Sequence, residues 1–306
     1  MNDDKNDDKV AELPMDPVPP ETLWYETGSS RVTVDLAAVS DRGLVRKNNE
    51  DHYLVMRFTR SMERLLTNLV AEQVPARVDE VGYGFVVADG MGGTAAGEVA
   101  SRMAISTLVS IALHESDWIF GISPGDTTRR VQRMTKRWAR VQEAIRARGN
   151  RDPALRQMGT TMIAAVSLGP RLVIGHIGDS RAYLLRRGEL HQLTRDHTLV
   201  QVLVDLGELT AEEAATDPRR HLLMRSFSAA DDTCQGEFQQ ATLADGDQLL
   251  FCTDGLTDMV DNETINSVLS RAASADEACQ GLLAAALNNG GNDNVTIAVA
   301  RYRIPQ

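Results

Sequence analysis

The sequence predicts an α+β protein with one large folded domain. Between residues 159 and 194, short strand-like segments alternate with glycine turns, which is typical of antiparallel hairpins and not of parallel βαβ units. Two segments with helical periodicity, 95–113 and 127–147, precede these hairpins. A chain of 306 residues that is 42% hydrophobic and 25% charged is long enough to bury a large core and has the composition of an ordinary globular domain.

The first 28 residues are interpreted as a disordered tail, so we place the folded domain at residues 29–306. The tail is acidic and then proline-rich, with too few apolar residues to fold alone. Its negative charge is opposite to that of a secretory signal, and no apolar region follows. The longest apolar stretch, 103–113, contains three hydroxyl residues and is too short for a bilayer span. We therefore expect a cytoplasmic protein.

The elements of the N-terminal half follow from apolar periodicity. Strands are predicted where β-branched residues partly alternate with polar ones, at residues 31–39, 52–58 and 82–89. The segment 59–81 is expected to form an inserted helix and a loop. In the helix predicted over 127–147, one stripe is apolar: Val131, Met134, Trp138, Val141 and Ile145.

The C-terminal half begins with a surface excursion. Residues 198–220 are predicted to contain a pair of helices broken at Gly207. A strand over 247–254, helices over 263–288 and a strand over 294–302 complete the chain. No internal repeat is found.

Charge and cysteine content exclude some classes of function. A net charge of −11 argues against general nucleic-acid binding, which depends on clustered Lys and Arg. Arginine supplies nearly all of the positive charge, so specific phosphate contacts through a guanidinium group remain open. The three cysteines, Cys234, Cys252 and Cys279, lack the close pairs of a zinc site and are interpreted as reduced and mostly buried.

The segment "FVVADGMGGTAAGEVA" (85–100) allows three interpretations: a plain turn, a dinucleotide-binding loop or a metal site. A dinucleotide fold needs a second parallel strand after its crossover helix, but here the helix continues through that distance. Asp89 would also set a carboxylate beside a pyrophosphate. The glycines are not followed by a Walker-type Lys-Ser/Thr, and no Gly-x-Ser-x-Gly nucleophile elbow is found.

Acidic residues recur where predicted strands begin or end. Asp89 and Asp254 each follow an apolar strand and precede glycine, and Asp293 stands just before a strand. Carboxylates grouped at sheet edges suit hard divalent cations. The pair Glu50-Asp51 also leads into a strand. One Asp-Gly is more often a turn than a ligand, as we expect for Asp245-Gly246, so the set carries more weight than any member.

Six segments in register closely resemble the bacterial branch of the metal-dependent Ser/Thr protein phosphatases, the type 2C (PPM) family. They are "SDRGLVRKNNED", "VVADGMGGTAAGEVAS", "MGTT", "HIGDSRAYLLRRGEL", "LLFCTDGLTD" and "GGNDNVTIAVA". The resemblance covers residues 31 to 303. It implies a four-layer α-β-β-α sandwich, with a metal site in a cleft at one edge of two antiparallel sheets and a flap at about 198–220.

The resemblance also implies roles for individual residues. Asp89 matches the carboxylate that bridges two Mn²⁺ or Mg²⁺ ions, Asp254 and Asp293 complete one ion's shell, and Glu50 and the Gly90 carbonyl serve the other. Asp179 matches a residue that helps hold a third ion, with orientation of Arg181 or the capping of a turn as the alternative. Arg46 matches the residue that grips the substrate phosphate. Asp51 looks structural or supporting.

The implied reaction is hydrolysis of phosphoserine and phosphothreonine in proteins by water that two cations activate. The implied partners are phosphorylated proteins, including a cognate Ser/Thr kinase and its substrates, in bacterial signalling. Animal relatives have a histidine where this chain has Met91, so the proton for the leaving group must come from elsewhere. His52, His176 and His197 are candidates by residue type alone, and His176 is more typical of a packed core residue. Near the flap, where many bacterial relatives have a histidine before a proline, this chain has Asp217-Pro218, with His221 nearby.

The alternative function is an interaction module that keeps the phosphatase fold without activity. Such proteins usually lack some of the metal carboxylates. Here Glu50, Asp89, Asp254 and Asp293 are all present, which favours the enzyme.

Overall fold

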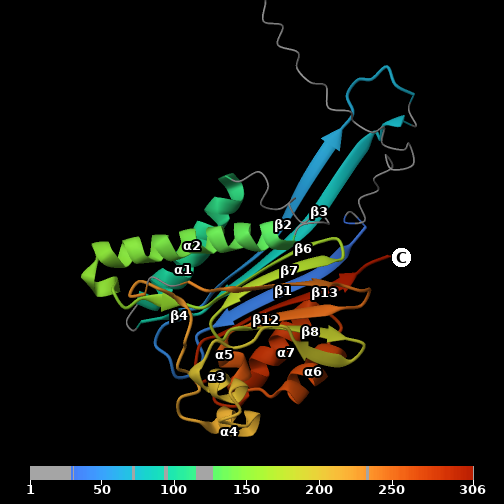
Figure 1. The fold of residues 1–306 in the computed structure, drawn as a ribbon. Coiled ribbons are helices and arrows are strands. Elements are labelled where there is room, and N and C mark those ends of the chain that lie inside the picture. The colour runs from blue at the N-terminus through green and yellow to red at the C-terminus, as the bar shows by residue number, and fades with distance from the viewer. Residues whose placement is uncertain are drawn as a thin grey trace, which may run out of the picture.

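The protein is a four-layer sandwich in which two antiparallel sheets are flanked by helices, as predicted (Figure 1). The computed structural model describes residues 29, 31–70, 73–92, 96–114, 127–231 and 234–305, with residues 127–130 described by their backbone alone. The predicted tail, residues 1–28, lies outside the described part.

Each main sheet has five strands. The first sheet has the order β1 (Thr33–Asp41), β13 (Val295–Arg303), β12 (Gln248–Cys252), β8 (Arg181–Arg186) and β9 (Glu189–Gln192). The second has the order β11 (Glu237–Thr242), β7 (Arg171–Ile177), β6 (Met162–Leu168), β3 (Arg77–Ala88) and β2 (His52–Glu63). A small third sheet pairs β10 (Phe227–Ser228), β5 (Gly159–Thr160) and β4 (Gly90–Met91).

Helices cover both outer faces (Figure 1). α1 (Ala96–His114) and α2 (Thr127–Arg151) lie on the second sheet, and α6 (Asn262–Arg271) and α7 (Ala275–Asn288) lie on the first. The shorter helices are η3 (Pro153–Leu155), α3 (Leu199–Asp205), α4 (Ala211–Thr216) and α5 (Asp254–Thr257). As predicted, α3 and α4 are separated at Gly207, which adopts a φ of +73°.

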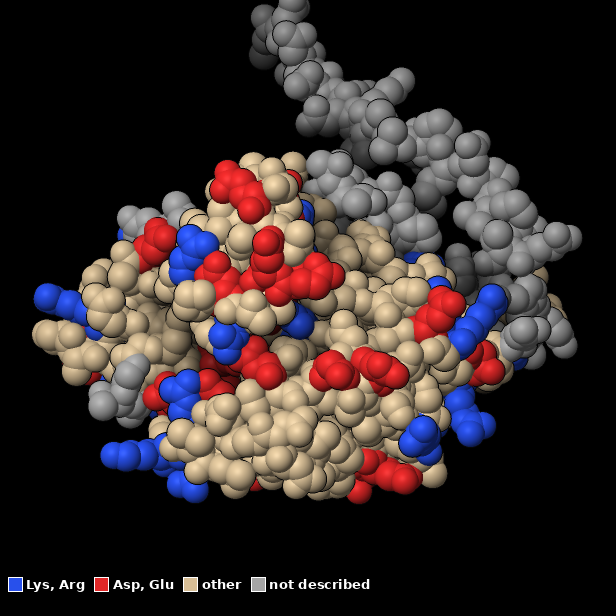
Figure 2. Space-filling model, turned by 90° about the horizontal axis from the view of Figure 1, so that it is seen from below, with Lys and Arg blue, Asp and Glu red and all other residues tan. Residues whose placement is uncertain are grey.

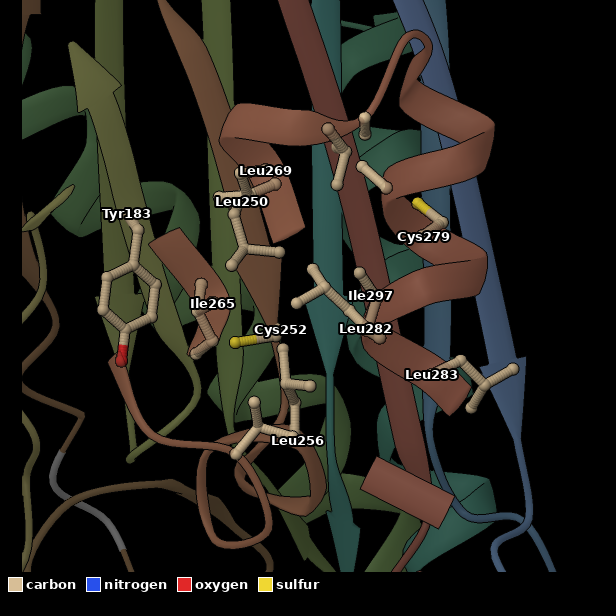
Figure 3. Close-up of a cluster of buried hydrophobic side chains, with 14 of the residues drawn as sticks. Tyr183, Leu250, Cys252, Leu256, Ile265, Leu269, Cys279, Leu282, Leu283 and Ile297 are labelled. Atoms are coloured by element: carbon tan, nitrogen blue, oxygen red, sulfur yellow. The ribbon is translucent and has the colours of Figure 1, made fainter. Parts of the chain in front are cut away.

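The core has three layers because the central strands are buried on both faces. In β12, Leu249 and Phe251 point into the layer between the sheets, and Leu250 and Cys252 point toward α6 and α7 (Figure 3). The ring of Phe251 stacks on that of Phe85 from β3, with centroids 5.1 Å apart. Successive side chains therefore pack into different core layers. Because both faces are buried, the sequences of these strands are continuous apolar runs without polar alternation.

α1 is long and apolar enough to cross a membrane by length and composition, contrary to the expectation that its apolar stretch is too short. One such helix is weak evidence of a span. Ala100, Ala104 and Leu108 of α1 are buried in one cluster with Trp138 and Ile145 of α2. This is the packing of a core helix.

The helix predicted within residues 59–81 is wrong in the part of that segment that the structure describes. β2 and β3 form one long hairpin and remain paired from His52 opposite Ala88 to Glu63 opposite Arg77. Local helix propensity contributes little free energy, and the continuous backbone hydrogen bonds between two paired strands outweigh it. Strands β10 and β11 were also not predicted.

The cysteines lie as expected. Cys252 and Cys279 are buried, Cys234 is half-buried, and all three are free thiols.

Candidate metal centre

A cleft of about 680 Å³ opens at the edge of the sandwich where strands of both sheets end. All of the site residues expected from the sequence line it: Arg46, Glu50, Asp89, Gly90, Asp179, Asp254 and Asp293. Acidic side chains gather around a hollow in the face shown in Figure 2. The structure thus brings together residues that are up to 247 positions apart in the chain.

Asp89 is held rigidly at the end of β3. Its backbone N–H donates to the Thr161 hydroxyl at 3.1 Å, and its carbonyl accepts from the Thr161 N–H at 2.9 Å and from the Thr160 hydroxyl at 2.8 Å. Burial raises the pKa of Asp89 well above its usual range, and the nearby carboxylates of Asp51 and Asp254 raise it further. The "MGTT" segment therefore fixes the main chain of a carboxylate in an acidic environment.

Two glycines bring the main chain close to the carboxylate of Glu50. A Cβ added to Gly90 would lie 2.2 Å from the carbonyl oxygen of Gly97, and one added to Gly97 would lie 2.5 Å from Glu50 Oε2. Glu50 therefore sits against the first turn of α1, where the helix dipole favours negative charge. Any larger residue at 90 or 97 would separate these groups.

Asp254 and Asp293 come from neighbouring strands of the first sheet. Asp254 is the first residue of α5, directly after β12, and Asp293 lies two residues before β13. A Cβ at Gly255 would lie 1.9 Å from the carbonyl oxygen of Asn294, so only glycine permits this approach of the two loops. Arg46 forms an ion pair with Asp293 while its guanidinium remains more than half exposed in the cleft.

Asn294 ties the loop before β2 to the loop before β13. Its side-chain oxygen accepts from the backbone N–H of Glu50 at 2.8 Å, and its Nδ2 donates to the carbonyls of Arg42 and Asn48, each at 2.9 Å. Both donors and the acceptor oxygen of one amide therefore bond to the segment that carries Arg46 and Glu50.

Asp51 lies beneath the cleft and is only 5% exposed, consistent with the structural role expected for it. Its Oδ2 accepts from the Thr253 hydroxyl at 2.9 Å. Burial raises the pKa of Asp51 to about 7, and the charges of Asp254 and Asp293 also raise it, against hydrogen bonds that lower it.

Asp179 is buried and lines the cleft, as its expected role in ion binding requires. One alternative role, orientation of Arg181, is performed by Asp196, whose carboxylate accepts three hydrogen bonds from that guanidinium at 3.0, 3.1 and 2.7 Å. Burial raises the pKa of Asp179 well above its usual range, and the charge of Asp254 adds to this effect.

His221 and Asp258 line the cleft but are not among the ligands predicted from the sequence, which offered contact with a third ion as an open role for His221 alone. His221 Nδ1 lies 3.7 Å from Asp254 Oδ2, and its Nε2 lies 3.5 Å from Asp258 Oδ2. The nearby carboxylate of Asp254 raises the pKa of His221, and the charge of Asp258 also raises it. Asp258 could have been found from its spacing of four residues after Asp254, which places both acids on one side of α5.

The other candidate histidines lie away from the cleft lining that the structure describes. His52 contacts the Ser101 hydroxyl at 2.9 Å, and the His176 and His197 rings stack with centroids 4.6 Å apart. His197 Nδ1 accepts from the backbone N–H of Gly178 at 3.1 Å, so its Nε2 carries the proton and faces Glu237 Oε1 at 3.3 Å. Although His176, His197 and Glu237 lie close enough to share an ion, this tautomer does not suit metal binding.

The donor set in the cleft fits divalent cations. Carboxylates and a main-chain carbonyl are the oxygen ligands that Mn²⁺ and Mg²⁺ prefer. Asp254 Oδ1 and Asp51 Oδ1 are buried without a hydrogen-bond partner among the residues that the structure describes. Such groups are costly unless a cation or a proton compensates them.

Comparison with known proteins assigns the chain to a family. The model of the family described as protein phosphatase 2C matches residues 73–289. The chain belongs to the protein phosphatase 2C family. Among curated relatives, the phosphatase 2C chain is 40% identical over 273 residues to the serine/threonine protein phosphatase PstP of Mycobacterium tuberculosis, covering 89% of this chain and 46% of PstP. It is 31% identical over 268 residues to the protein phosphatase PhpP of Streptococcus pneumoniae, covering 87% and 96%.

Solved structures agree with this assignment. The crystal structure of M. tuberculosis PstP superposes with a TM-score of 0.70 at 37% identity, covering 88% of this chain and 98% of that one. A PstP catalytic domain in complex with two manganese ions gives a TM-score of 0.69 at 36% identity, covering 89% and 99%. The phosphatase 2C chain described here spans about half the length of the curated PstP sequences.

The segment expected to be the phosphatase 2C flap, residues 198–220, borders the cleft. A second cavity of about 780 Å³ lies between α3, α4 and the body of the domain. It shares five residues with the metal cleft: Asp179, Arg220, His221, Asp254 and Asp258. Movement of this segment would therefore change access to the cleft.

Proposed function

We propose that this protein is a metal-dependent serine/threonine phosphatase that hydrolyses phosphoserine and phosphothreonine in other proteins. One observation carries the proposal: Glu50, Asp89, Asp254 and Asp293, from four distant segments, converge on one cleft with Arg46 at its rim. The names of PstP and PhpP support the reaction class.

The residues that would hold the cations follow from their places in the cleft. Asp89 would serve two Mn²⁺ or Mg²⁺ ions, Asp254 and Asp293 one of them, and Glu50 with the Gly90 carbonyl the other. Asp179 would serve a third ion together with Asp254. The manganese ions in the PstP catalytic domain support this assignment. Bound divalent cations lower the pKa of water toward neutrality and offset the negative charge of a phosphoryl group.

The protein's own groups position the reactants. Thr160 and Thr161 fix the main chain of Asp89, so the carboxylate extends into the cleft from a fixed point. Arg46 presents a planar and always charged guanidinium, which suits two phosphoryl oxygens at once and can exchange its contact with Asp293 for a phosphate. Met91 offers no proton at the position where animal relatives have a histidine.

The test is release of inorganic phosphate from a phosphothreonine peptide with and without Mn²⁺. We expect turnover that requires the metal and disappears in Asp254→Asn. Asp245→Asn is the matched control, because Asp245 sits in a plain turn before β12, where its carboxylate accepts from the Ile304 N–H at 2.9 Å. Inactivity of the wild type in saturating Mn²⁺ would favour the alternative, an interaction module without activity.

We further propose that the phosphatase domain spans residues 29–306 with its flap at 198–220, and that it acts in the cytoplasm on a cognate Ser/Thr kinase and the substrates of that kinase. The names of the bacterial relatives, which are protein phosphatases, support the proposed class of substrates. Comparison of the phosphoproteome with and without an active copy would test it. Unchanged Ser/Thr phosphorylation would contradict the proposed partners.

A further inference from the structure

Helix α2 concentrates positive charge in an acidic protein. Its 25 residues include eight arginines and Lys136, with Glu143 as the single acidic residue. These residues give α2 a formal charge of +8, so the rest of the chain, whose total is −11, carries −19. A separation of charge on this scale creates a local positive field that an average over the whole chain conceals.

Five of these cations lie on one side of the helix. The α2 stripe consists of Arg133, Lys136, Arg140, Arg148 and Arg151. At 100° per residue, they fall within about 120° of one another, on an arc whose centre lies about 130° from the buried Trp138 and Ile145 and which also contains the buried Arg137. All but Arg133, which is half-buried, are exposed. From Arg133 to Arg151 the stripe is about 27 Å long, at 1.5 Å per residue.

The ion pair that Arg148 of the stripe forms is weak. Arg148 pairs with Asp152 at 3.3 Å, and both side chains are more than a third exposed. Exposed pairs of this kind are weak and exchange readily with other anions. The inference rests on the summed charge of the helix and does not require any one of the arginines to lack a partner.

The C-terminal end of the stripe leads toward the metal cleft. α2 ends at Arg151 and is followed by η3 and then β5, which pairs with β4. A Cβ added to Gly92 would lie 2.6 Å from the carbonyl oxygen of Gln157, and Gly92 lines the cleft. In Figure 1 this end of α2 and β4 lie on the same side of the molecule.

We propose that the α2 stripe is a docking surface for acidic segments of phosphorylated protein substrates. This proposal rests on the proposed phosphatase function and adds a substrate class, namely phosphoproteins with Asp- and Glu-rich sequence beside the phosphorylated residue. The length of the stripe matches about eight residues of extended polypeptide at 3.3 Å each. A longer polyanion such as duplex DNA would extend over the acidic remainder of the surface, so a short acidic peptide is the better fit.

The experiment compares three phosphothreonine peptides with one common core. One peptide has no extension, one has eight Asp or Glu residues, and one has eight Ser or Gln residues, with extensions made on either side of the core. In Mn²⁺ at low salt, we expect kcat/KM for the acidic peptide to exceed that for the neutral one by about tenfold, because steering by a charged surface raises encounter rates. The preference should shrink at high salt.

The decisive variant is Lys136→Glu combined with Arg151→Glu. We expect it to lose the preference for the acidic peptide while hydrolysing the peptide without extension at the wild-type rate. The matched control, Arg271→Glu with Arg303→Glu, makes the same change of charge at exposed positions on α6 and β13 and should keep the preference. If the charge reversal unfolds the protein, Lys136→Gln with Arg151→Gln replaces it and should reduce the preference by about half.

Equal rates on the acidic and neutral peptides, or a preference that survives in the Lys136 and Arg151 variants, would overturn the proposal. Failure of the proposed function is distinguishable, since the peptide without extension would then also resist hydrolysis. Binding of fluorescently labelled, unphosphorylated peptides decides docking independently of hydrolysis. Wild-type protein that binds duplex DNA or anionic vesicles, but not the acidic peptide, would also overturn it.

Discussion

The side-chain oxygen of Asn294 accepts a hydrogen bond from the backbone N–H of Glu50 at 2.8 Å, although 244 positions separate the two residues. Glu50 precedes β2 in the second sheet, and Asn294 precedes β13 in the first. This contact therefore holds together the two halves of the metal cleft, with no charge of its own.

Replacement of Asn294 by alanine should weaken Mn²⁺ binding and turnover by about 10- to 100-fold, the usual cost of losing a group that orients ligands. The backbone N–H of Glu50 and the carbonyls of Arg42 and Asn48 would lose their partner. Mn²⁺ titration by calorimetry and steady-state kinetics would measure both effects. Asn266→Ala is the control. Asn266 lies in α6, and its side chain donates to the carbonyl of Gly188 and forms no hydrogen bond with a residue of the metal cleft in the described structure. Equal effects of the two changes would refute a role in ligand orientation.

Asp89→Asn should reduce turnover by about a thousandfold or more, which corresponds to about 4 kcal/mol of barrier. Melting in the presence of a chelator should change little or shift upward, because the neutral amide relieves repulsion from Asp51 and Asp254. Steady-state kinetics would test the loss of turnover, and differential scanning fluorimetry in a chelator would test the melting temperature. A wild-type rate would contradict the site, and a large loss of metal-free stability would make Asp89 primarily structural.

Arg46→Ala should raise KM for phosphopeptides more than it lowers kcat, because the guanidinium contacts phosphate both before and during the reaction. Arg46→Lys keeps the charge but loses the planar pair of donors, so it should recover only part of the affinity. Initial rates over a range of peptide concentrations would measure both constants. An unchanged KM in Arg46→Ala would reassign this residue to its ion pair with Asp293.

Asp51 should make the metal-free protein less stable as the pH rises. In the folded protein burial raises its pKa to about 7, whereas the unfolded chain loses this proton near pH 4. The stability contributed by the protonated form is therefore complete below about pH 4 and is lost as the pH rises through about 7. Asp51→Asn keeps a hydrogen-bond acceptor for Thr253. Because an amide does not titrate, the variant should not lose stability in this way as the pH rises. Its free energy of unfolding, relative to the wild type, should increase by about 4 kcal/mol between pH 4 and pH 8, at about 1.36 kcal/mol for each pKa unit between the folded and unfolded states. Denaturant melts in a chelator at several pH values would measure the difference. A constant difference would show that Asp51 keeps an ordinary pKa.

The acidic residues of the cleft were predictable because each stands at a strand boundary that periodicity reveals. Asp89, Asp254 and Asp293 adjoin apolar strands and glycines, and their order in the chain matches a family pattern. The cleft contains all of them. That these residues bind metal, and that Arg46 binds phosphate, stays a prediction, since a position in a cleft does not establish a ligand.

Other features depend on contacts that local sequence does not encode. An asparagine such as Asn294 has no periodicity or charge pattern to mark its partners. The extension of β2 to Glu63 is set by its pairing with β3 across the hairpin, and the local sequence alone favoured a helix. The role of Asp196 in holding Arg181 likewise follows from a loop folding back on β8.

The position of β13 has a consequence for synthesis of the chain. β13 lies between β1 and β12 in the first sheet, and in the described structure it is the strand with which β1 pairs. β1 cannot form its pairing until the ribosome has made residues 295–303. Asp293 is added just before these residues. The acidic cleft is therefore complete only after Asp293 and β13 have been made, and a chain that ends before Asp293 would lack both.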